Sequence, residues 1–119
     1  MKNTELREKE YFSLLNQLEE EHYQAINNLD EVNYSIYCLE ELKKIDKESS
    51  ILFPVLNGIL IEGKIKKARE VKVNVGAGVM TTKSVDEVIS MLKAKQKELK
   101  ARVNKIKVQI DNITRLIQK

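Results

Sequence analysis

The stretch VDEVISMLKAKQKELKARVNKIKVQIDNITRLI, residues 85–117, decides the fold of this chain. Its apolar residues recur at alternating intervals of four and three, and Gln96 is the one polar residue in this pattern. An even period of 3.5 residues predicts a helix that buries one stripe in a left-handed coiled coil. The positions of this stripe are Val85, Ile89, Leu92, Gln96, Leu99, Val103, Ile106, Ile110, Ile113 and Ile117.

The start of this helix has a sequence signal of its own. Ser84 is followed three residues later by Glu87, which is typical of a capping box at a helix N-terminus. We therefore assign residues 84–119 to a C-terminal helix.

A second stripe with the same spacing lies near the N-terminus. No Gly or Pro interrupts it, and the pattern stops before the polar run 46–50, so we assign residues 4–48 to an N-terminal helix. Its positions are Tyr11, Leu15, Leu18, His22, Ala25, Leu29, Val32, Ile36 and Leu39.

The two stripes are nearly equal in length, which favours an antiparallel pair. Placing Leu39 opposite Val85 brings Tyr11 opposite Ile113, so both chain ends are expected at one end of the pair. Residues 1–48 carry 6 Lys/Arg against 12 Asp/Glu, whereas residues 49–119 carry 15 against 6. The halves have net charges of −6 and +9 and attract each other, although exposed ion pairs contribute only about 0.2–1 kcal/mol each.

The segment between the helices changes period and predicts two β-hairpins over residues 51–82. Asn57-Gly58 separates two apolar runs and is a strong hairpin signal, while Gly76-Ala77-Gly78 follows a clean period-two alternation. Pro54 cannot donate to a strand ladder, so its strand is expected to lie at an edge or to bend there. The apolar strand residues are Ile51, Phe53, Val55, Ile59, Ile61, Val71, Val73, Val75 and Val79.

These elements predict one α+β domain over residues 1–119, a long antiparallel two-helix coiled coil with two central hairpins at its base. Two isolated hairpins with this much apolar surface require further strands to cover them. The chain is therefore expected to form an oligomer through the hairpins.

Residues for catalysis or for metal or cofactor binding are scarce. His22 occupies a stripe position, where a polar residue more often fixes the register of a coiled coil than binds a ligand. Cys38 is the single cysteine and lies off the stripe, and Gly76-Ala77-Gly78 lacks the ending of a phosphate-binding loop. We expect no enzyme activity, no metal and no cofactor.

Composition limits the partners and the compartment. No apolar run approaches the ~18 residues of a membrane span, and the charged N-terminus does not resemble a signal peptide. A lone cysteine fits a reducing compartment, so a soluble cytoplasmic protein without membrane contact is expected. The second helix is rich in lysine, but it has no aromatic residue for base stacking and lies beside an acidic helix, so nucleic acid is not the expected partner.

Some apolar residues near the chain ends lie outside the two stripes. A two-helix coil has nothing behind it to cover them, so they either meet another subunit or form a contact patch. Scattered single apolar residues are also common on surfaces, which leaves chance as an alternative. These residues are Leu6, Phe12, Leu14, Val108 and Leu116.

The central segment resembles the alpha-class subunit of prefoldin. The family's signature of a VPV/L strand, a GKI/L strand end, a V-x-V-x-V-G-x-G hairpin and a K-S/T helix start is matched in order. The matching stretches are ILFPV at 51–55, GKI at 63–65, VKVNVGAGV at 71–79 and Lys83-Ser84. Leu56-Asn57 departs from the pattern because small residues are usual at that turn. The compact form is that of an archaeal-type subunit.

The resemblance implies an ATP-independent chaperone subunit in a hexamer of two alpha-type and four beta-type subunits. Such a hexamer captures unfolded proteins and delivers them to a group II chaperonin, with the chain ends as the client-binding tips. A coiled-coil scaffold that binds one defined partner is the alternative from another class, and a nucleic-acid-binding coiled coil is a third.

Overall fold

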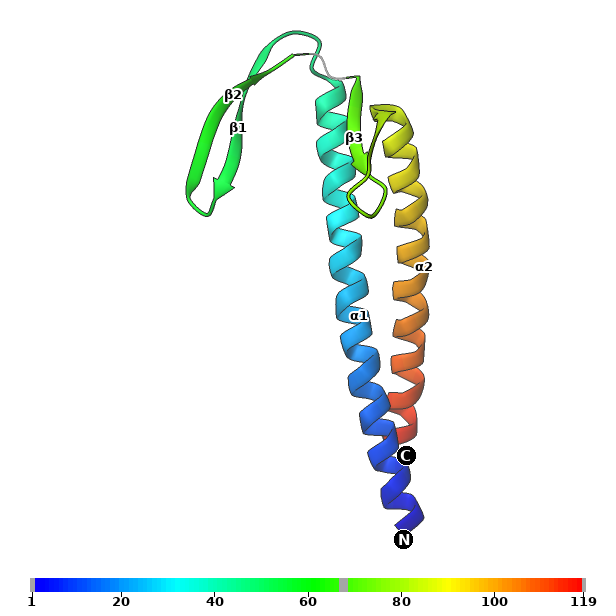
Figure 1. Ribbon diagram of the computed structural model, residues 1–119. Coiled ribbons are helices and arrows are strands. Elements are labelled where there is room, and N and C mark those ends of the chain that lie inside the picture. Colours follow the sequence, from blue (N-terminus) through cyan, green and yellow to red (C-terminus); the bar gives the residue numbers. More distant parts are fainter. Residues whose placement is uncertain (1, 67–68, 119) are drawn as a thin grey trace. The chain divides into compact units, whose positions relative to one another are not determined.

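The computed structural model describes residues 2–66 and 69–118, with side chains from residue 6 onward. The elements follow one another as α1 (Lys2–Lys43), β1 (Ser49–Leu56), β2 (Ile59–Ile65), β3 (Glu70–Asn74), β4 (Met80–Ser84) and α2 (Val85–Gln118) (Figure 1). This order of two long helices around two β-hairpins confirms the predicted α+β class. Contacts group the chain into two units, residues 1–33 with 94–119, and residues 34–93.

Several boundaries differ from those predicted. Helix α1 ends at Lys43 instead of 48, because the bonds from Lys44 N to Glu41 O and from Ile45 N to Leu42 O tighten the last turn and stop the helix. The helices are 42 and 34 residues long, so they differ in length more than the two nearly equal stripes do. Strand β1 begins at Ser49, and β4 continues to Ser84 and leads directly into α2. The predicted helix end at residue 119 and part of the polar stretch 64–70 lie outside the described residues.

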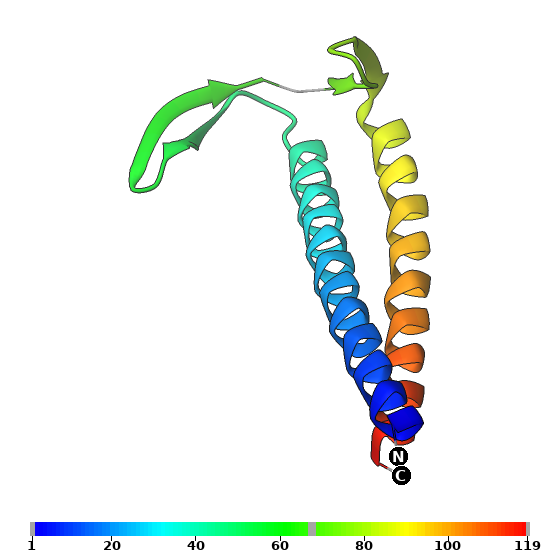
Figure 2. The ribbon, with the colours of Figure 1, turned by 60° about the horizontal axis from the view of Figure 1, so that its bottom comes forward.

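The first unit is a pair of antiparallel helix segments. Leu18 and Ala25 of α1 form a buried cluster with Ile106 of α2, and Val103, Ile110 and Ile113 pack against it. Both chain ends lie at the same end of this pair (Figures 1 and 2). In the whole described chain, the buried apolar residues all occupy predicted stripe positions: Leu18, Ala25, Ile36, Val85, Ile89, Leu99 and Ile106.

At Gln96 the register of the pair differs from the predicted one by five residues, which is more than one helical turn. Gln96 Nε2 donates to Asn33 Oδ1 over 2.6 Å, whereas the predicted register places residue 28 opposite Gln96. The prediction aligned the ends of the two stripes, but α1 continues past the end of its stripe. A consequence is that α2 ends near Tyr11, and residues 6–10 of α1 are all exposed.

In the second unit, β1 and β2 form a two-stranded antiparallel sheet closed by Asn57-Gly58, as predicted. Only Gly58 has a positive φ, of 80°, so the turn is not the type I′ form in which both central residues are left-handed. The register shifts between Pro54 and Leu56, which leaves Val55 as the extra residue of a bulge. The strand thus bends next to the proline, as predicted.

Strands β3 and β4 form a second two-stranded sheet. Its loop holds Gly76, Ala77 and Gly78 in succession at positive φ, and the Asn74 side chain accepts a bond from Gly76 N over 2.9 Å. Val75 and Val79 lie beyond the strand ends, which corrects their assignment to strands. They remain paired, because Val75 N donates to Val79 O over 2.9 Å.

Candidate interaction surfaces

The β1–β2 hairpin carries apolar side chains on both of its faces. Phe53 lies opposite Ile61 on one face, and Leu60 lies opposite Pro54 on the other. In this chain the hairpin leaves seven large apolar side chains exposed: Leu52, Phe53, Val55, Leu56, Ile59, Leu60 and Ile61. We call these seven residues the hairpin surface. A two-stranded sheet cannot cover two apolar faces by itself, so this surface is suited to assembly.

The Phe53 ring lies over Gly63 of the neighbouring strand, in the space that a side chain at this position would occupy. A Cβ built on Gly63 would lie 2.8 Å from Phe53 Cε2 and 3.2 Å from Phe53 Cδ2. The ring can therefore take this position on the sheet because residue 63 is glycine.

The second hairpin has one apolar face. Val71 and Val73 are half-buried, while Lys72 and Asn74 between and beside them are exposed. Val71 and Val73 line a groove of about 460 Å³, together with residues of both helices in the same unit: Tyr34, Ser35, Cys38, Leu39, Val88 and Leu92. Val75 and Val79 are exposed at the loop end, so the predicted assembly residues of this hairpin divide into a packed pair and an open pair.

The residues predicted as client contacts are all exposed in the first unit. Their exposed fractions range from 41% for Leu14 to 57% for Val108. Leu14 also borders a notch of about 230 Å³ with Leu18 and Ile113. We call the set Leu6, Phe12, Leu14, Val108 and Leu116 the helix-end surface.

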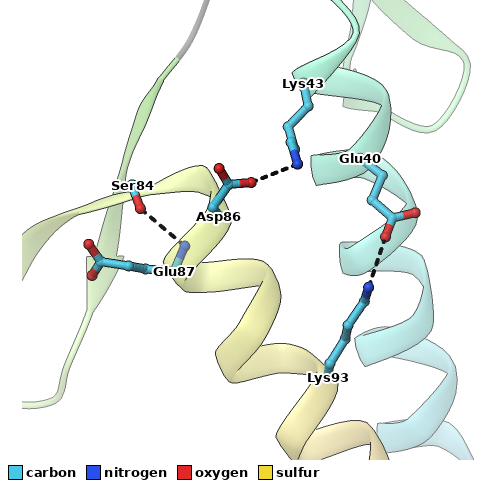
Figure 3. A network of polar contacts seen from close by, with 6 residues as sticks. All are labelled: Glu40, Lys43, Ser84, Asp86, Glu87 and Lys93. Atoms are coloured by element: carbon cyan, nitrogen blue, oxygen red, sulfur yellow. Dashed lines mark hydrogen bonds and ion pairs between the residues drawn. The ribbon is translucent and has the colours of Figure 1, made fainter.

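A polar network joins the helices within the second unit, where α2 begins (Figure 3). Glu87 N donates to Ser84 Oγ over 3.1 Å, which is one of the two bonds of the predicted capping box. Lys43 Nζ lies 2.7 Å from Asp86 Oδ1, and Lys93 Nζ lies 3.6 Å from Glu40 Oε1. The hydrogen bond to the Asp86 carboxylate raises the pKa of Lys43. The contribution of the pair to stability is present at neutral pH and is lost as the pH rises through that raised pKa.

Neither His22 nor Cys38, the two side chains considered for catalysis or ligand binding, belongs to this polar network. His22 is half-buried at its stripe position, and Cys38 is an exposed free thiol. A hydrogen bond with the Cys38 thiol raises the pKa of Tyr34, which lies one turn earlier on α1. Within the described ranges, no three His, Cys, Asp or Glu side chains are grouped so as to hold a metal ion. The described helices also include none that is long and apolar enough to cross a membrane.

A family model for prefoldin subunits matches residues 11–119. The chain belongs to the prefoldin family. Prefoldin subunit alpha of Thermococcus onnurineus is 43% identical over 61 residues, which are 50% of this chain and 42% of that protein. Prefoldin subunit alpha of Pyrococcus horikoshii is 38% identical over 68 residues, which are 56% of this chain and 46% of that protein. The resemblance to alpha-class prefoldin is thus confirmed.

The matches to curated prefoldins cover only part of each protein. The chain spans about half the length of the curated relatives it matches, or somewhat less. A chain of filamentous PFD from Methanocaldococcus jannaschii, solved by cryo-EM, has a TM-score of 0.75 with 20% sequence identity. The match covers 92% of this chain and 91% of that one. This structural likeness confirms the prefoldin-like fold.

The sequence interpretation missed part of the hairpin surface. It named the alternate residues of β1 and β2 but not Leu52, Leu56 and Leu60, which are at least as exposed. Leu52 and Leu60 point to the face opposite that of Phe53 and Ile61. The continuous apolar run in β1 was the available signal, because a strand covered on one face alternates whereas one covered on both faces does not. Tyr34 and Tyr37, exposed on α1, were missed as well.

Proposed function

We propose that this prefoldin chain is the alpha-type subunit of an ATP-independent, non-enzymatic chaperone of the cytoplasm. Its hairpins assemble with beta-type subunits into a hexamer of two alpha and four beta chains. The helix-end surface captures unfolded polypeptides, and the complex delivers them to a group II chaperonin.

The observation that carries this proposal is the exposure of the helix-end surface beside both chain ends. These side chains are apolar, lie off the buried stripe and remain 41–57% exposed against the described part of the chain. Fully burying one such side chain against a partner contributes about 1.5–3 kcal/mol. Several arms acting together raise the effective concentration of the second and later contacts, so weak patches suffice to hold an unfolded chain.

The hairpin surface supports the assembly part of the proposal. It offers apolar residues on two faces and unpaired strand edges, which further strands can extend. A scaffold would need a surface that fits one folded partner. The helix-end surface does not favour this alternative, because it consists of separated single side chains.

The test is suppression of aggregation of a denatured client, measured without nucleotide on the chain mixed with a beta-type subunit. Replacing Phe12, Leu14, Val108 and Leu116 with serine is expected to weaken client binding by about tenfold or more, because apolar contacts are lost. The control replaces Tyr23 and Met91, which are 66% and 49% exposed elsewhere on the helices, with serine. Unchanged suppression by the first variant would refute the assignment. Stable capture of one folded protein without suppression would favour the scaffold.

A further inference from the structure

A groove of about 330 Å³ runs along one side of the helix pair in the first unit, and none of the residues that line it belongs to the helix-end surface. Its floor includes Ala25 and Leu99, which are 3% and 6% exposed. Ala25 is the smallest residue of the α1 stripe, where larger aliphatic residues are usual in coiled coils. A leucine at this position would fill part of the groove.

The two walls of the groove carry opposite charges. Glu21 and Glu31 line the α1 side, whereas Lys95 and Arg102 line the α2 side. Among the ion pairs of the described residues, none joins these walls, and Lys95 instead lies 3.9 Å from Glu98 on its own helix. The acidic and basic side chains of the groove are therefore not joined to each other by an ion pair, and Glu21 Oε1 instead accepts a hydrogen bond from Gln17 Nε2 over 3.4 Å on its own helix.

The dimensions of the groove fit an extended peptide. Glu21 and Glu31 are separated by about 15 Å along the helix at ~1.5 Å per residue. About five residues of extended chain cover that distance at ~3.3 Å each. Successive side chains of an extended chain point to opposite sides, so alternate residues would face the acidic wall and the basic wall. Gln24 and Asn28, which also line the groove, offer amide groups to the peptide backbone.

We propose that this groove binds an extended client segment in which basic and acidic side chains alternate. The basic side chains lie against Glu21 and Glu31, and the acidic ones lie against Lys95 and Arg102. The inference rests on the proposed function. It gives the groove a selectivity for the charge pattern of a client, whereas the helix-end surface recognises apolar residues. A nucleic acid does not fit, because its phosphates would meet the acidic wall.

The experiment uses the full chain and two fluorescent eight-residue peptides of identical composition. One alternates lysine and glutamate singly, which places each charge on its own side of an extended chain. The other alternates them in pairs, which mixes both charges on both sides. Fluorescence anisotropy is expected to show about tenfold tighter binding of the first peptide, which corresponds to about 1.4 kcal/mol.

Two variants locate the binding. Ala25→Leu fills the floor and is expected to abolish the preference for the first peptide. Because a larger side chain also alters packing, Glu31→Gln with Lys95→Gln tests the same point at exposed positions that do not affect the core. The matched control is Glu20→Gln with Lys97→Gln, which removes one charge of each sign outside the groove and is expected to retain the preference.

Equal binding of the two peptides, or a preference that survives both groove variants, would overturn the inference. Stronger binding of an oligonucleotide than of either peptide would do the same. These results are separable from the proposed function, because aggregation suppression by the wild-type chain depends on the helix-end surface and would persist.

Discussion

At the scale of single residues, the arrangement of the first hairpin depends on the Phe53 ring, which packs against Gly63 where there is no side chain. Gly63 has an ordinary φ, so its conformation does not require glycine. What requires glycine is the Phe53 ring, which occupies the space where a Cβ would lie. Half of the ring's surface remains available to other chains, since Phe53 is 45% exposed.

Gly63→Ala is expected to destabilise the β1–β2 hairpin by about 1 kcal/mol, because the added methyl group displaces the Phe53 ring. In a Phe53→Ala background the same change is expected to stabilise it by about 0.5 kcal/mol, because alanine loses less backbone entropy than glycine. Amide hydrogen exchange of the strand residues measures both effects. The same sign in both backgrounds would show that the ring contact does not determine the need for glycine.

At the scale of elements, the helices were largely predictable and their relative register was not. Every predicted stripe position is buried or half-buried, because the 3.5-residue period is a local property of the sequence. Register depends on where the helices stop and on which side chains meet across the pair. Neither the tightened turn after Lys43 nor the Asn33–Gln96 bond has a local signal.

The same distinction applies to the candidate surfaces. Phe12 and Leu14 were predictable as exposed residues, because the period alone places them off the stripe. The groove at Ala25 was not predictable, because it depends on which α2 residues face the alanine, and this follows from the register. The residues that line it include Leu99, which is also a stripe position.

The Asn33–Gln96 bond is expected to fix the register at some cost in stability, as a single polar stripe residue does in coiled coils. Gln96→Leu should therefore raise the stability of the helix pair by about 1 kcal/mol. It should also add a second register, displaced by about 5.4 Å, which is one turn. Spin labels at Glu20 and Lys107 in a Cys38→Ser background report the distance between the helices. Lys97→Leu, off the stripe, is the control, and a single unchanged distance in Gln96→Leu would contradict this role.

At the scale of the whole molecule, the chain exposes different apolar surfaces in its two contact units. The hairpin surface belongs to residues 34–93, and the helix-end surface belongs to the unit formed by both chain ends. Assembly and client capture are therefore expected to be separable by mutation.

Ile59→Thr with Ile61→Thr is expected to lower the mass of the native complex formed with a beta-type subunit, measured by native mass spectrometry. Threonine keeps the β-branched shape that strands favour but removes apolar contacts with other subunits. The helix content should not change. Tyr23→Thr with Met91→Thr, which alters similarly exposed residues on the helices, should leave the mass unchanged. A complex of full mass in the first variant would place assembly elsewhere.

The two small sheets have a consequence for the life of the chain in a cell. Within residues 2–66 and 69–118 each sheet has two strands, so a newly made copy presents unpaired amide and carbonyl groups along both outer edges of each sheet. A copy made in excess of its proposed partners would pair with exposed strands of nascent chains and would be recognised by quality-control proteases. Under the proposed assembly, balanced synthesis of the subunits is expected to protect the cell from the unpaired form of the protein.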